Sequence, residues 1–383
     1  MTTARSLSSI ASDSARHRVT DRLGATVEGD LTRFVVWAPS AAALTLVLPD
    51  RDEVVVAGRG GAPGEWAAQV GGIGHGERYW WSIDDGDPRP DPASAWQPDG
   101  VHGPSAVVDH ARFDWTDDEW RGRGLTGSAF YELHVGTFTP GGTLDTAIDE
   151  LPRLADLGIT TIELMPLAEF AGDRNWGYDG VAPWSVHDGY GGPEALARFV
   201  DTAHRHDLAV VLDVVFNHFG PEGNHLPQFG PYLTDEYRTP WGSAVNVAGQ
   251  QSDGVRRYFV EATERWIRDF HVDGLRLDAV HAIIDPTATP FWADICRVAR
   301  TTACSVGRKI VLVGESSDND PRQLHPVERI GLGLDAVWCD DVHHNLRVAT
   351  TGDRHSYYAD YDGTPDELAD TVRHRWRFRG QYS

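Results

Sequence analysis

Hydrophobic and polar residues change their spacing part-way along the chain, which divides it into two regions. Between residues 25 and 113, short alternating segments (RFVVWAPSAAALTLVL, EWAAQV, RYWWSID) are separated by glycine-rich turns (GRGGAPG, GGIGHG). No helical period is sustained there. Alternation of this kind, with frequent turn residues, is typical of strands that bury one face. The pattern predicts a small N-terminal β-sandwich over residues 25–113.

From residue 129 onward, apolar runs alternate with segments of helical spacing. The expected strands are 129–138, 160–167, 209–218, 274–280, 310–316 and 334–341. The expected helices are 143–159, 194–207, 255–270 and 291–303. Such units build either a (β/α)8 TIM-type barrel or an open doubly wound sheet. No glycine-rich phosphate-binding motif follows the first strand, which disfavours the nucleotide-binding folds.

The ends of the chain carry two further expectations. The α/β barrel is assigned to residues 114–383, yet only about six of its eight strands have a candidate segment. An incomplete barrel is therefore expected. Residues 1–24 are polar and have no apolar core, which argues against a secretory signal and predicts a disordered leader.

Composition narrows the classes of partner. The chain has 383 residues, is 41% hydrophobic, and carries a formal net charge of −23. Negative charge of this size disfavours nucleic acid and anionic membranes as partners, but it does not affect neutral sugars. No apolar run approaches the roughly 18 residues of a membrane span. The three cysteines have no CxxC spacing, which predicts neither disulfides nor a zinc site and favours the cytoplasm.

Three of the apolar runs end on carboxylates, namely Asp213, Asp278 and Glu315. A parallel barrel gathers the C-terminal ends of its strands around one pocket, and catalytic residues come from several of those ends. Two carboxyl groups about 5 to 5.5 Å apart are what a retaining glycosidase requires. The three strand ends therefore suggest acid/base and nucleophilic chemistry on a glycosidic bond.

Asp278 and Glu315 differ in their surroundings. Arg276 lies two positions before Asp278, so both side chains point to the same side of the strand. A neighbouring guanidinium keeps a carboxylate ionised, as a nucleophile requires; the alternative is a structural ion pair. Glu315 ends an apolar strand, where a carboxyl group can serve as a proton donor; the alternative is a cap on the next helix.

Two other clusters carry possible binding residues. Asp213, Asn217 and His218 together could bind Ca²⁺, hydrogen-bond to sugar hydroxyls, or hold a loop. Trp176 and Tyr178 offer ring faces for a sugar, or pack within their own loop. The histidine–carboxylate spacings of common catalytic metal sites are missing, so no metal is expected.

The motifs DVVFNH, GLRLDAVH and GES resemble three motifs of the α-amylase superfamily of glycosidases. This resemblance implies a (β/α)8 barrel with Asp278 as nucleophile and Glu315 as acid/base. It implies Tyr178 as a stacking platform for the sugar at the cleavage point. It also implies sugar contacts from Asp213, His218, Arg276 and His281. FVVWAP and RYWWSID are similar to the β-sandwich that precedes the barrel in branching, debranching and trehalose-forming members.

A finer resemblance is to the trehalose-releasing hydrolases of that superfamily, carried by DPASAWQPDGVHGPS, IELMPLAEFAGDRNWGYDGV and ESSDNDPR among other stretches. It implies cleavage of the α-1,4 bond next to the terminal trehalose of maltooligosyltrehalose, a maltooligosaccharide substrate and no organic cofactor. Asp341, His343 and His344 resemble pocket residues on the leaving-group side.

One departure from the superfamily keeps other functions open. Its third catalytic aspartate follows the seventh strand, and no matching motif follows Asp341. One alternative is a 1,4-α-glucan branching enzyme, which uses the same two carboxylates. The other is a glucan-binding protein without catalysis.

Overall fold

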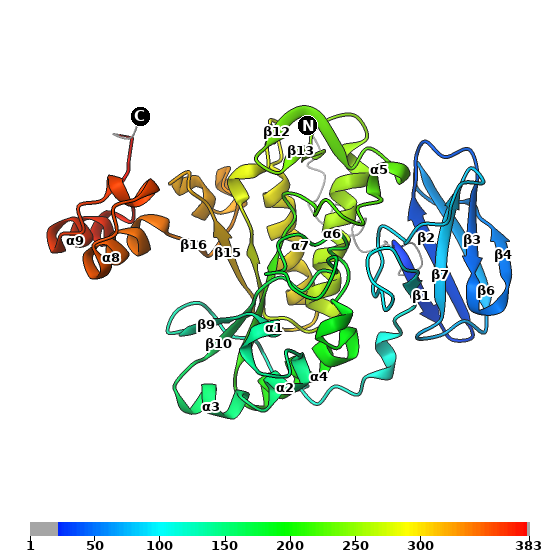
Figure 1. Ribbon diagram of the computed structural model, residues 1–383, viewed down its shortest axis with the longest axis horizontal. Helices are drawn as coiled ribbons and strands as arrows, with labels where there is room; N and C mark the ends of the chain where they lie inside the picture. The colour runs from blue at the N-terminus through cyan, green and yellow to red at the C-terminus, as the bar shows by residue number, and fades with distance from the viewer. Residues whose placement is uncertain (1–21, 381–383) are drawn as a thin grey trace, which may run out of the picture.

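The computed structural model describes residues 22–380, which form a β-sandwich joined to a curved α/β sheet (Figure 1). The sandwich has two antiparallel four-stranded sheets, with the orders β1-β2-β6-β5 and β4-β3-β7-β8. Their strands are β1 Gly24–Glu28, β2 Leu31–Trp37, β3 Leu44–Leu48, β4 Glu53–Val56, β5 Gly58–Arg59, β6 Glu65–Gly71, β7 Arg78–Ile83 and β8 Ser105–Ala106. The predicted sandwich is confirmed. Residues 1–21 of the predicted leader lie outside the described residues.

Alternation of side chains produces the sandwich. In β3, Leu44, Leu46 and Leu48 are buried, whereas the residues between them are partly exposed. Successive strand residues point to opposite faces, so one face of β3 enters the core. Phe34 of β2 meets Tyr79 of β7 edge to face, with ring centroids 4.9 Å apart. These rings join the two sheets through the middle of the sandwich.

A six-stranded parallel sheet follows and curls into half of a barrel. Its order is β16-β15-β14-β11-β10-β9, and every neighbouring pair is parallel. The strands are β9 Phe130–Leu133, β10 Thr161–Leu164, β11 Ala209–Val214, β14 Gly274–Leu277, β15 Val311–Glu315 and β16 Ala336–Trp338. The prediction of a TIM-type barrel with about six strands is confirmed. A separate antiparallel hairpin, β12 Leu233–Thr239 and β13 Gly242–Val245, lies in the insertion after β11.

Helices flank this sheet, α5 lies beside the sandwich, and α8 and α9 lie beyond β16 (Figure 1). The helices are α1 Val135–Phe138, α2 Leu144–Ile148, α3 Leu151–Asp156, α4 Gly192–Arg205, α5 Leu226–Phe229, α6 Ser252–Asp269, α7 Phe291–Ser305, α8 Asp340–Thr351 and α9 Pro365–His374. None of the helices within residues 22–380 combines the length and apolarity that a membrane crossing needs.

Several predicted elements are wrong in their extent. The strand expected over 129–138 ends at Leu133, and residues 135–138 form α1, while the strand expected over 209–218 ends at Val214. The single helix expected over 143–159 is broken into α2 and α3, because Pro152 sits in the first turn of α3 and cannot continue a helix from upstream. The strand expected over 334–341 ends at Trp338. Asp340 and Asp341 instead begin α8, where carboxylates favour the N-terminal end of a helix.

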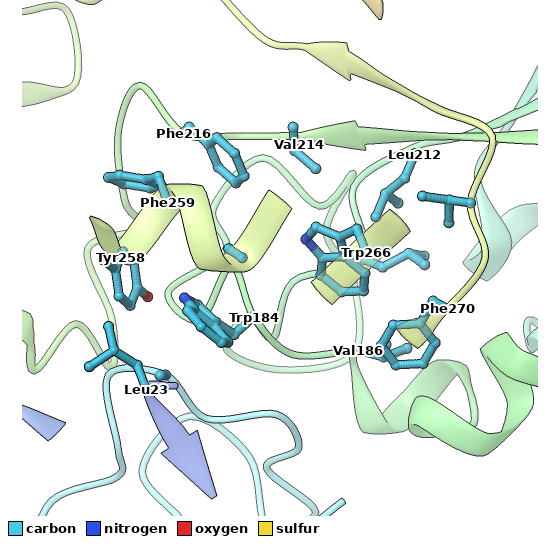
Figure 2. Close-up of a cluster of buried hydrophobic side chains, with 14 of the residues drawn as sticks. Leu23, Trp184, Val186, Leu212, Val214, Phe216, Tyr258, Phe259, Trp266 and Phe270 are labelled. Atoms are coloured by element: carbon cyan, nitrogen blue, oxygen red, sulfur yellow. The ribbon is translucent and has the colours of Figure 1, made fainter. Parts of the chain in front are cut away.

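The core is continuous from the sandwich into the half-barrel. Figure 2 shows Trp266 of α6 beside Leu212 of β11, and Phe259 of α6 beside Phe216, which follows β11. Trp266 is 1% exposed, and truncating such a side chain to alanine costs about 3 to 5 kcal/mol. This packing fixes β11 and its neighbour β14, whose ends carry the candidate site.

The sandwich is joined to α6 by a close approach of backbone to ring. Trp37 lies over Gly254, where an added Cβ atom would stand 2.1 Å from the indole. The same indole meets Tyr232 edge to face, with centroids 5.2 Å apart. Glycine at position 254 therefore allows the two regions to share one core.

Candidate active site

Strand register brings the predicted carboxylates together. Arg276 is the register partner of Asp213 on β11 and of Val313 on β15. Because Leu277 pairs with Gly314, Asp278 and Glu315 leave the sheet as neighbours at the same edge. Side chains in register on parallel strands share a face. The three strand-end carboxylates thus surround Arg276.

One guanidinium contacts all three carboxylates. Arg276 Nη1 lies 2.6 Å from Asp278 Oδ1 and 3.1 Å from both oxygens of Asp213. Its Nη2 lies 3.2 Å from Glu315 Oε2. A planar guanidinium touching both Asp278 and Glu315 keeps their carboxylates within about 8 Å of each other. Glycosidases place their two carboxyl groups about 5 to 9.5 Å apart, depending on mechanism.

The backbone after Asp278 also contributes. Ala279 has a left-handed conformation, with φ of 40°, and its N–H donates to Glu315 Oε2 at 2.9 Å. A left-handed conformation is unusual for a residue other than glycine, and such strain gathers at functional sites. The side chain of Asn217 donates to the carbonyl of Asp278 at 2.8 Å and to its carboxylate at 2.7 Å. Asn217 thus orients Asp278 from the other side.

Tyr178 and His218 line the same cluster from the loops. The Tyr178 hydroxyl donates to Asp213 Oδ2 at 2.8 Å. His218 is held by the Tyr178 carbonyl at 2.9 Å and by the Asn217 side chain at 2.6 Å. The predicted residues Tyr178, Asp213, His218, Arg276, Asp278 and Glu315 therefore form one connected group.

Burial sets the charges of this group. Burial raises the pKa of Asp213 above its ordinary value, although Arg276 opposes that shift. Burial and Asp213 raise the pKa of Tyr178, so its hydroxyl keeps its proton. For Arg276, the carboxylates outweigh burial and raise the pKa, so the cation persists. Burial lowers the pKa of His218, which leaves the ring neutral at pH 7.

A fourth carboxyl group lies deeper on the same face of the sheet. Glu163 of β10 pairs in register with Val211 and with Glu132, and is 1% exposed. Burial and the charge of Glu132 raise the pKa of Glu163 to about 7. At neutral pH Glu163 therefore carries only part of a negative charge below Arg276.

The other predicted residues lie away from the cluster. A cleft of about 660 Å³ runs from Glu315 to α8, and Asp341 and His343 line its far wall. Asp341 is buried and accepts hydrogen bonds from Tyr361 and from the backbone of residues 377 and 378, whereas His343 is exposed. His281 is exposed on the 3-10 turn that follows β14.

Trp241 is a feature of the site that the sequence interpretation did not single out. It lies in the turn between β12 and β13 and is 48% exposed. Its ring stacks on His218, with centroids 4.5 Å apart and planes at 4°. A half-exposed indole beside the cluster offers a flat apolar face. The only signal in the sequence is an aromatic residue within the turn TPWG.

Comparison with known families agrees with this geometry. Residues 98–237 match the model of the alpha amylase catalytic domain. Residues 22–97 match carbohydrate-binding module 48, the isoamylase N-terminal domain. The chain thus resembles the α-amylase family in the two consecutive domains that these models describe. The family resemblance predicted from DVVFNH, GLRLDAVH and GES is confirmed.

Curated relatives within the α-amylase family share most of the chain. Malto-oligosyltrehalose trehalohydrolase of Mycobacterium tuberculosis (strain ATCC 25618 / H37Rv) is 46% identical over 361 residues, covering 92% of this chain and 60% of the relative. The enzyme of the same name from Saccharolobus solfataricus is 40% identical, with coverages of 94% and 62%. The chain therefore spans about 60% of the length of these relatives.

Solved structures agree on the fold. A crystal structure from Salmonella typhimurium, described as an alpha amylase, superposes with a TM-score of 0.87 at 39% identity, covering 95% of this chain and 62% of that one. A pullulanase from Anoxybacillus sp. LM18-11 complexed with maltotriose gives a TM-score of 0.69 at 21% identity, with coverages of 90% and 55%. The second likeness concerns the fold alone.

Proposed function

We propose that this chain is the catalytic part of a retaining glycoside hydrolase that releases trehalose from maltooligosyltrehalose. The observation that carries the proposal is the single guanidinium of Arg276, which contacts both Asp278 and Glu315. The names of the relatives at 40% to 46% identity support the choice of substrate.

Double displacement assigns a task to each carboxylate. Asp278, paired with Arg276, attacks the anomeric carbon and forms a covalent glycosyl intermediate. Glu315 protonates the departing oxygen, then removes a proton from the water that hydrolyses the intermediate. The N–H of Ala279 and the guanidinium of Arg276 both contact Glu315, so they fix the position of its carboxyl group.

The remaining predicted residues bind the substrate. Tyr178 offers its ring to the sugar at the cleavage point, while Asp213 and His218 accept or donate hydrogen bonds to its hydroxyls. Arg276 and His281 are further contacts to that sugar, and Asp341, His343 and His344 contact the leaving-group side. No organic cofactor takes part in this mechanism. A maltooligosaccharide chain would extend along the cleft between Glu315 and α8.

A second candidate within the family is 1,4-α-glucan branching. The branching enzyme of Pseudoalteromonas atlantica is 31% identical over 281 residues, covering 66% of this chain and 38% of that enzyme. Branching keeps the same nucleophile and acid but delivers the glycosyl unit to a sugar hydroxyl. The lower identity and shorter coverage make this the weaker proposal.

A third candidate is glucan binding without turnover, because no carboxylate in the described part of the chain follows a seventh strand. The test compares this chain with a chimera that adds the C-terminal part of the Mycobacterium relative. Trehalose release from maltooligosyltrehalose by the chimera supports the hydrolase. New α-1,6 linkages in amylose, without trehalose, would support branching. Sugar binding without either product would support the third candidate.

We also propose a cytoplasmic location. Cys296, Cys304 and Cys339 are all free thiols. Unpaired cysteines are usual in proteins of reducing compartments. Fractionation of the source cells with an antibody against the chain tests the location.

A further inference from the structure

The far wall of the cleft holds a cluster of metal-ligand side chains that includes His343 and His344, two of the leaving-group contacts proposed above. Asp340, His343 and His344 lie in the first turns of α8. One donor atom from each lies within 4.8 Å of the other two. His343 Nε2 lies 3.7 Å from Asp340 Oδ1. We propose that these three side chains bind one divalent transition-metal ion of the zinc class.

Helical spacing explains how three donors meet. Positions i, i+3 and i+4 lie on one face of an α-helix, about one turn apart. Asp340 occupies the first of these positions, and His343 and His344 occupy the other two. The sequence interpretation expected no metal because it searched for spacings that begin with histidine. The spacing Asp-x-x-His-His becomes informative once α8 is known to begin at Asp340.

The ring of His344 is oriented by its surroundings. It stacks on Tyr357, with centroids 4.5 Å apart and planes at 23°. Its Nδ1 lies 3.4 Å from the Tyr361 hydroxyl. Nδ1 thus has a hydrogen-bonding partner, which leaves Nε2 as the nitrogen for a metal. Metal-bound histidines commonly use their second nitrogen in this way, and such a contact fixes the direction of the first.

The cleft is strongly acidic. Besides Asp340, its lining includes the carboxylates of Glu315, Asp318, Asp341 and Asp360. Negative side chains of this density raise the local concentration of cations. The N-terminal end of α8 has a partial positive charge that opposes a cation, and the surrounding carboxylates counteract it.

The donor set selects the class of metal. Two imidazoles and one carboxylate suit Zn²⁺, Ni²⁺, Co²⁺ and Cu²⁺, whereas Ca²⁺ and Mg²⁺ prefer oxygen ligands. Three protein ligands leave a coordination position for water. His343 is exposed, with 61% of its side chain accessible, so its ring has room to rotate toward the ion.

Isothermal titration calorimetry of the full chain with zinc chloride tests the site. The expected result is saturable binding of one Zn²⁺ for each chain, with no comparable signal from Ca²⁺ or Mg²⁺. His343→Ala and Asp340→Asn should each weaken Zn²⁺ binding by about tenfold or more, because a two-ligand site holds zinc poorly. Tetrahedral Co²⁺ should give visible absorption bands that both variants lose.

A matched control is His374→Ala. His374 forms an exposed pair with Asp370 at 3.0 Å on α9, but this pair has only one histidine. The control should bind Zn²⁺ as the unaltered chain does. Circular dichroism verifies that each variant is folded. Absence of saturable Zn²⁺ binding, or equal affinity in the His343→Ala, Asp340→Asn and unaltered chains, would overturn the proposal.

Discussion

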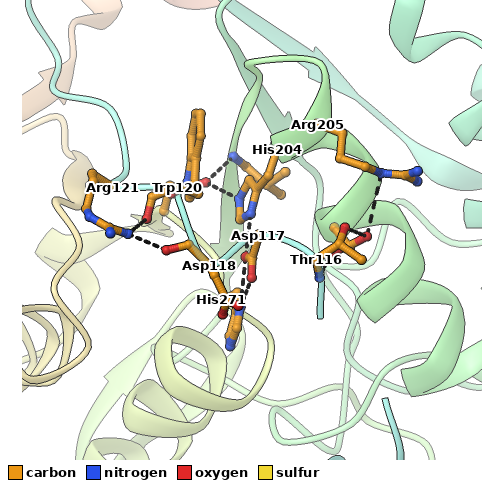
Figure 3. A network of polar contacts seen from close by, with 11 residues as sticks. Thr116, Asp117, Asp118, Trp120, Arg121, His204, Arg205 and His271 are labelled. Carbon is orange, nitrogen blue, oxygen red and sulfur yellow. Dashed lines mark hydrogen bonds and ion pairs between the residues drawn. The ribbon is translucent and has the colours of Figure 1, made fainter. Parts of the chain in front are cut away.

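Two buried clusters of charged side chains lie at opposite ends of strands β11 and β14, and they differ in how their charges are paired and in how open they are to solvent. At the C-terminal ends, Asp213, Asp278 and Glu315 share the one cation of Arg276 beside an open cleft. At the N-terminal ends, His204 lies between two carboxylates and is 6% exposed (Figure 3). The first cluster has more negative than positive charge, and the second has its hydrogen bonds satisfied.

The lower cluster connects distant segments of the chain. His204 of α4 contacts Asp117 Oδ2 at 2.8 Å and Asp273 Oδ2 at 2.9 Å. Asp273 also accepts from the Trp120 indole at 2.6 Å, and the Trp120 ring stacks on His204. His271 contacts Asp117 from the next loop at 2.8 Å. This cluster joins the linker after the sandwich to the base of the sheet.

The difference between the two clusters reflects two roles: the upper cluster is placed for chemistry and the lower one for stability. In parallel barrels the C-terminal face carries catalysis, and the opposite face carries residues that stabilise the fold. An unbalanced, partly open cluster can exchange protons and contact a substrate. A sealed and paired cluster can do neither, but it becomes costly to break. Each of the changes to these clusters should affect one end of the strands and leave the other unchanged, and a change to an exposed ion pair elsewhere serves as the comparison.

The largest effect is expected from Asp278→Asn and Glu315→Gln in the active chimera. Removal of the nucleophile or the acid should lower the turnover number by about 10⁴-fold or more. Sugar binding should change little, since both substitutions preserve shape. Trehalose release measures turnover, and calorimetry with a maltooligosaccharide measures binding. Unaltered turnover in either variant would remove the role assigned to that residue.

The next effect is expected from His204→Gln at the lower cluster. Removing the cation leaves Asp117 and Asp273 facing each other in the interior, and breaking such a buried pair costs about 3 to 5 kcal/mol. Urea denaturation followed by tryptophan fluorescence measures the free energy of unfolding. The double variant with Asp273→Asn should recover part of the loss. A loss below about 1 kcal/mol would show that the lower cluster does not stabilise the sheet.

A smaller effect is expected from pH. Burial alone would lower the pKa of His204, but its hydrogen bonds with Asp117 and Asp273 outweigh burial and raise it above 6.5. The stabilisation from the protonated ring is therefore complete below about pH 6.5 and is lost as pH rises through the higher folded-state pKa. The difference in unfolding free energy between the unaltered chain and His204→Gln should shrink between pH 6.5 and 9. A constant difference would contradict a charged His204.

Asp117 determines how the free energy of unfolding changes with pH on the acid side. Burial would raise its pKa, but hydrogen bonds with His204 and His271 lower it below its ordinary value. Stability from this carboxylate is present above about pH 4 and is lost as pH falls through the lower folded-state pKa. Lower-cluster stabilisation should thus be greatest between about pH 4 and 6.5.

At the upper end, Trp241→Ala tests a contact beside the cluster. Loss of the indole face that stacks on His218 should weaken maltooligosaccharide binding by about 1 kcal/mol, or roughly fivefold. Calorimetry with a maltooligosaccharide provides the measurement. Trp241→Phe keeps a ring and should retain most of the affinity. Equal affinities for the unaltered chain, Trp241→Ala and Trp241→Phe would show that the sugar does not contact Trp241.

The smallest effect is expected from Arg198→Ala, which breaks an exposed ion pair with Asp145. Both side chains are well exposed, and the guanidinium contacts the two carboxylate oxygens at 2.8 and 2.9 Å. Exposed pairs contribute about 0.2 to 1 kcal/mol, because water screens them. Urea denaturation should show a loss within that range. A loss as large as that of His204→Gln would show that burial does not distinguish the two pairs.

The sequence predicted the upper cluster better than the lower one for a physical reason. Asp213, Asp278 and Glu315 each end an apolar run, and parallel strands bring such ends together whatever the loops do. Asp117 and His204 are 87 residues apart, and neither lies at a strand end. Their meeting depends on how the linker crosses the base of the sheet, which no local pattern encodes.

Other misses have equally local causes. Pro152 divides a stretch whose apolar spacing suits one continuous helix. Trp241 reaches the site from a hairpin inserted after β11, and its position depends on the path of that insertion. Asn217 was recognised as part of a cluster, but its two bonds to Asp278 follow only from the turn that ends β11.

The peptide unit between Asp278 and Ala279 has a further consequence. Its carbonyl accepts from Asn217 and its N–H donates to Glu315, so one rigid plane is fastened at both edges. The planar peptide unit therefore sets the distance between the carboxyl groups of Asp278 and Glu315. Loops around the pocket can change in length and sequence, and so change which glucan binds, without changing the distance between Asp278 and Glu315.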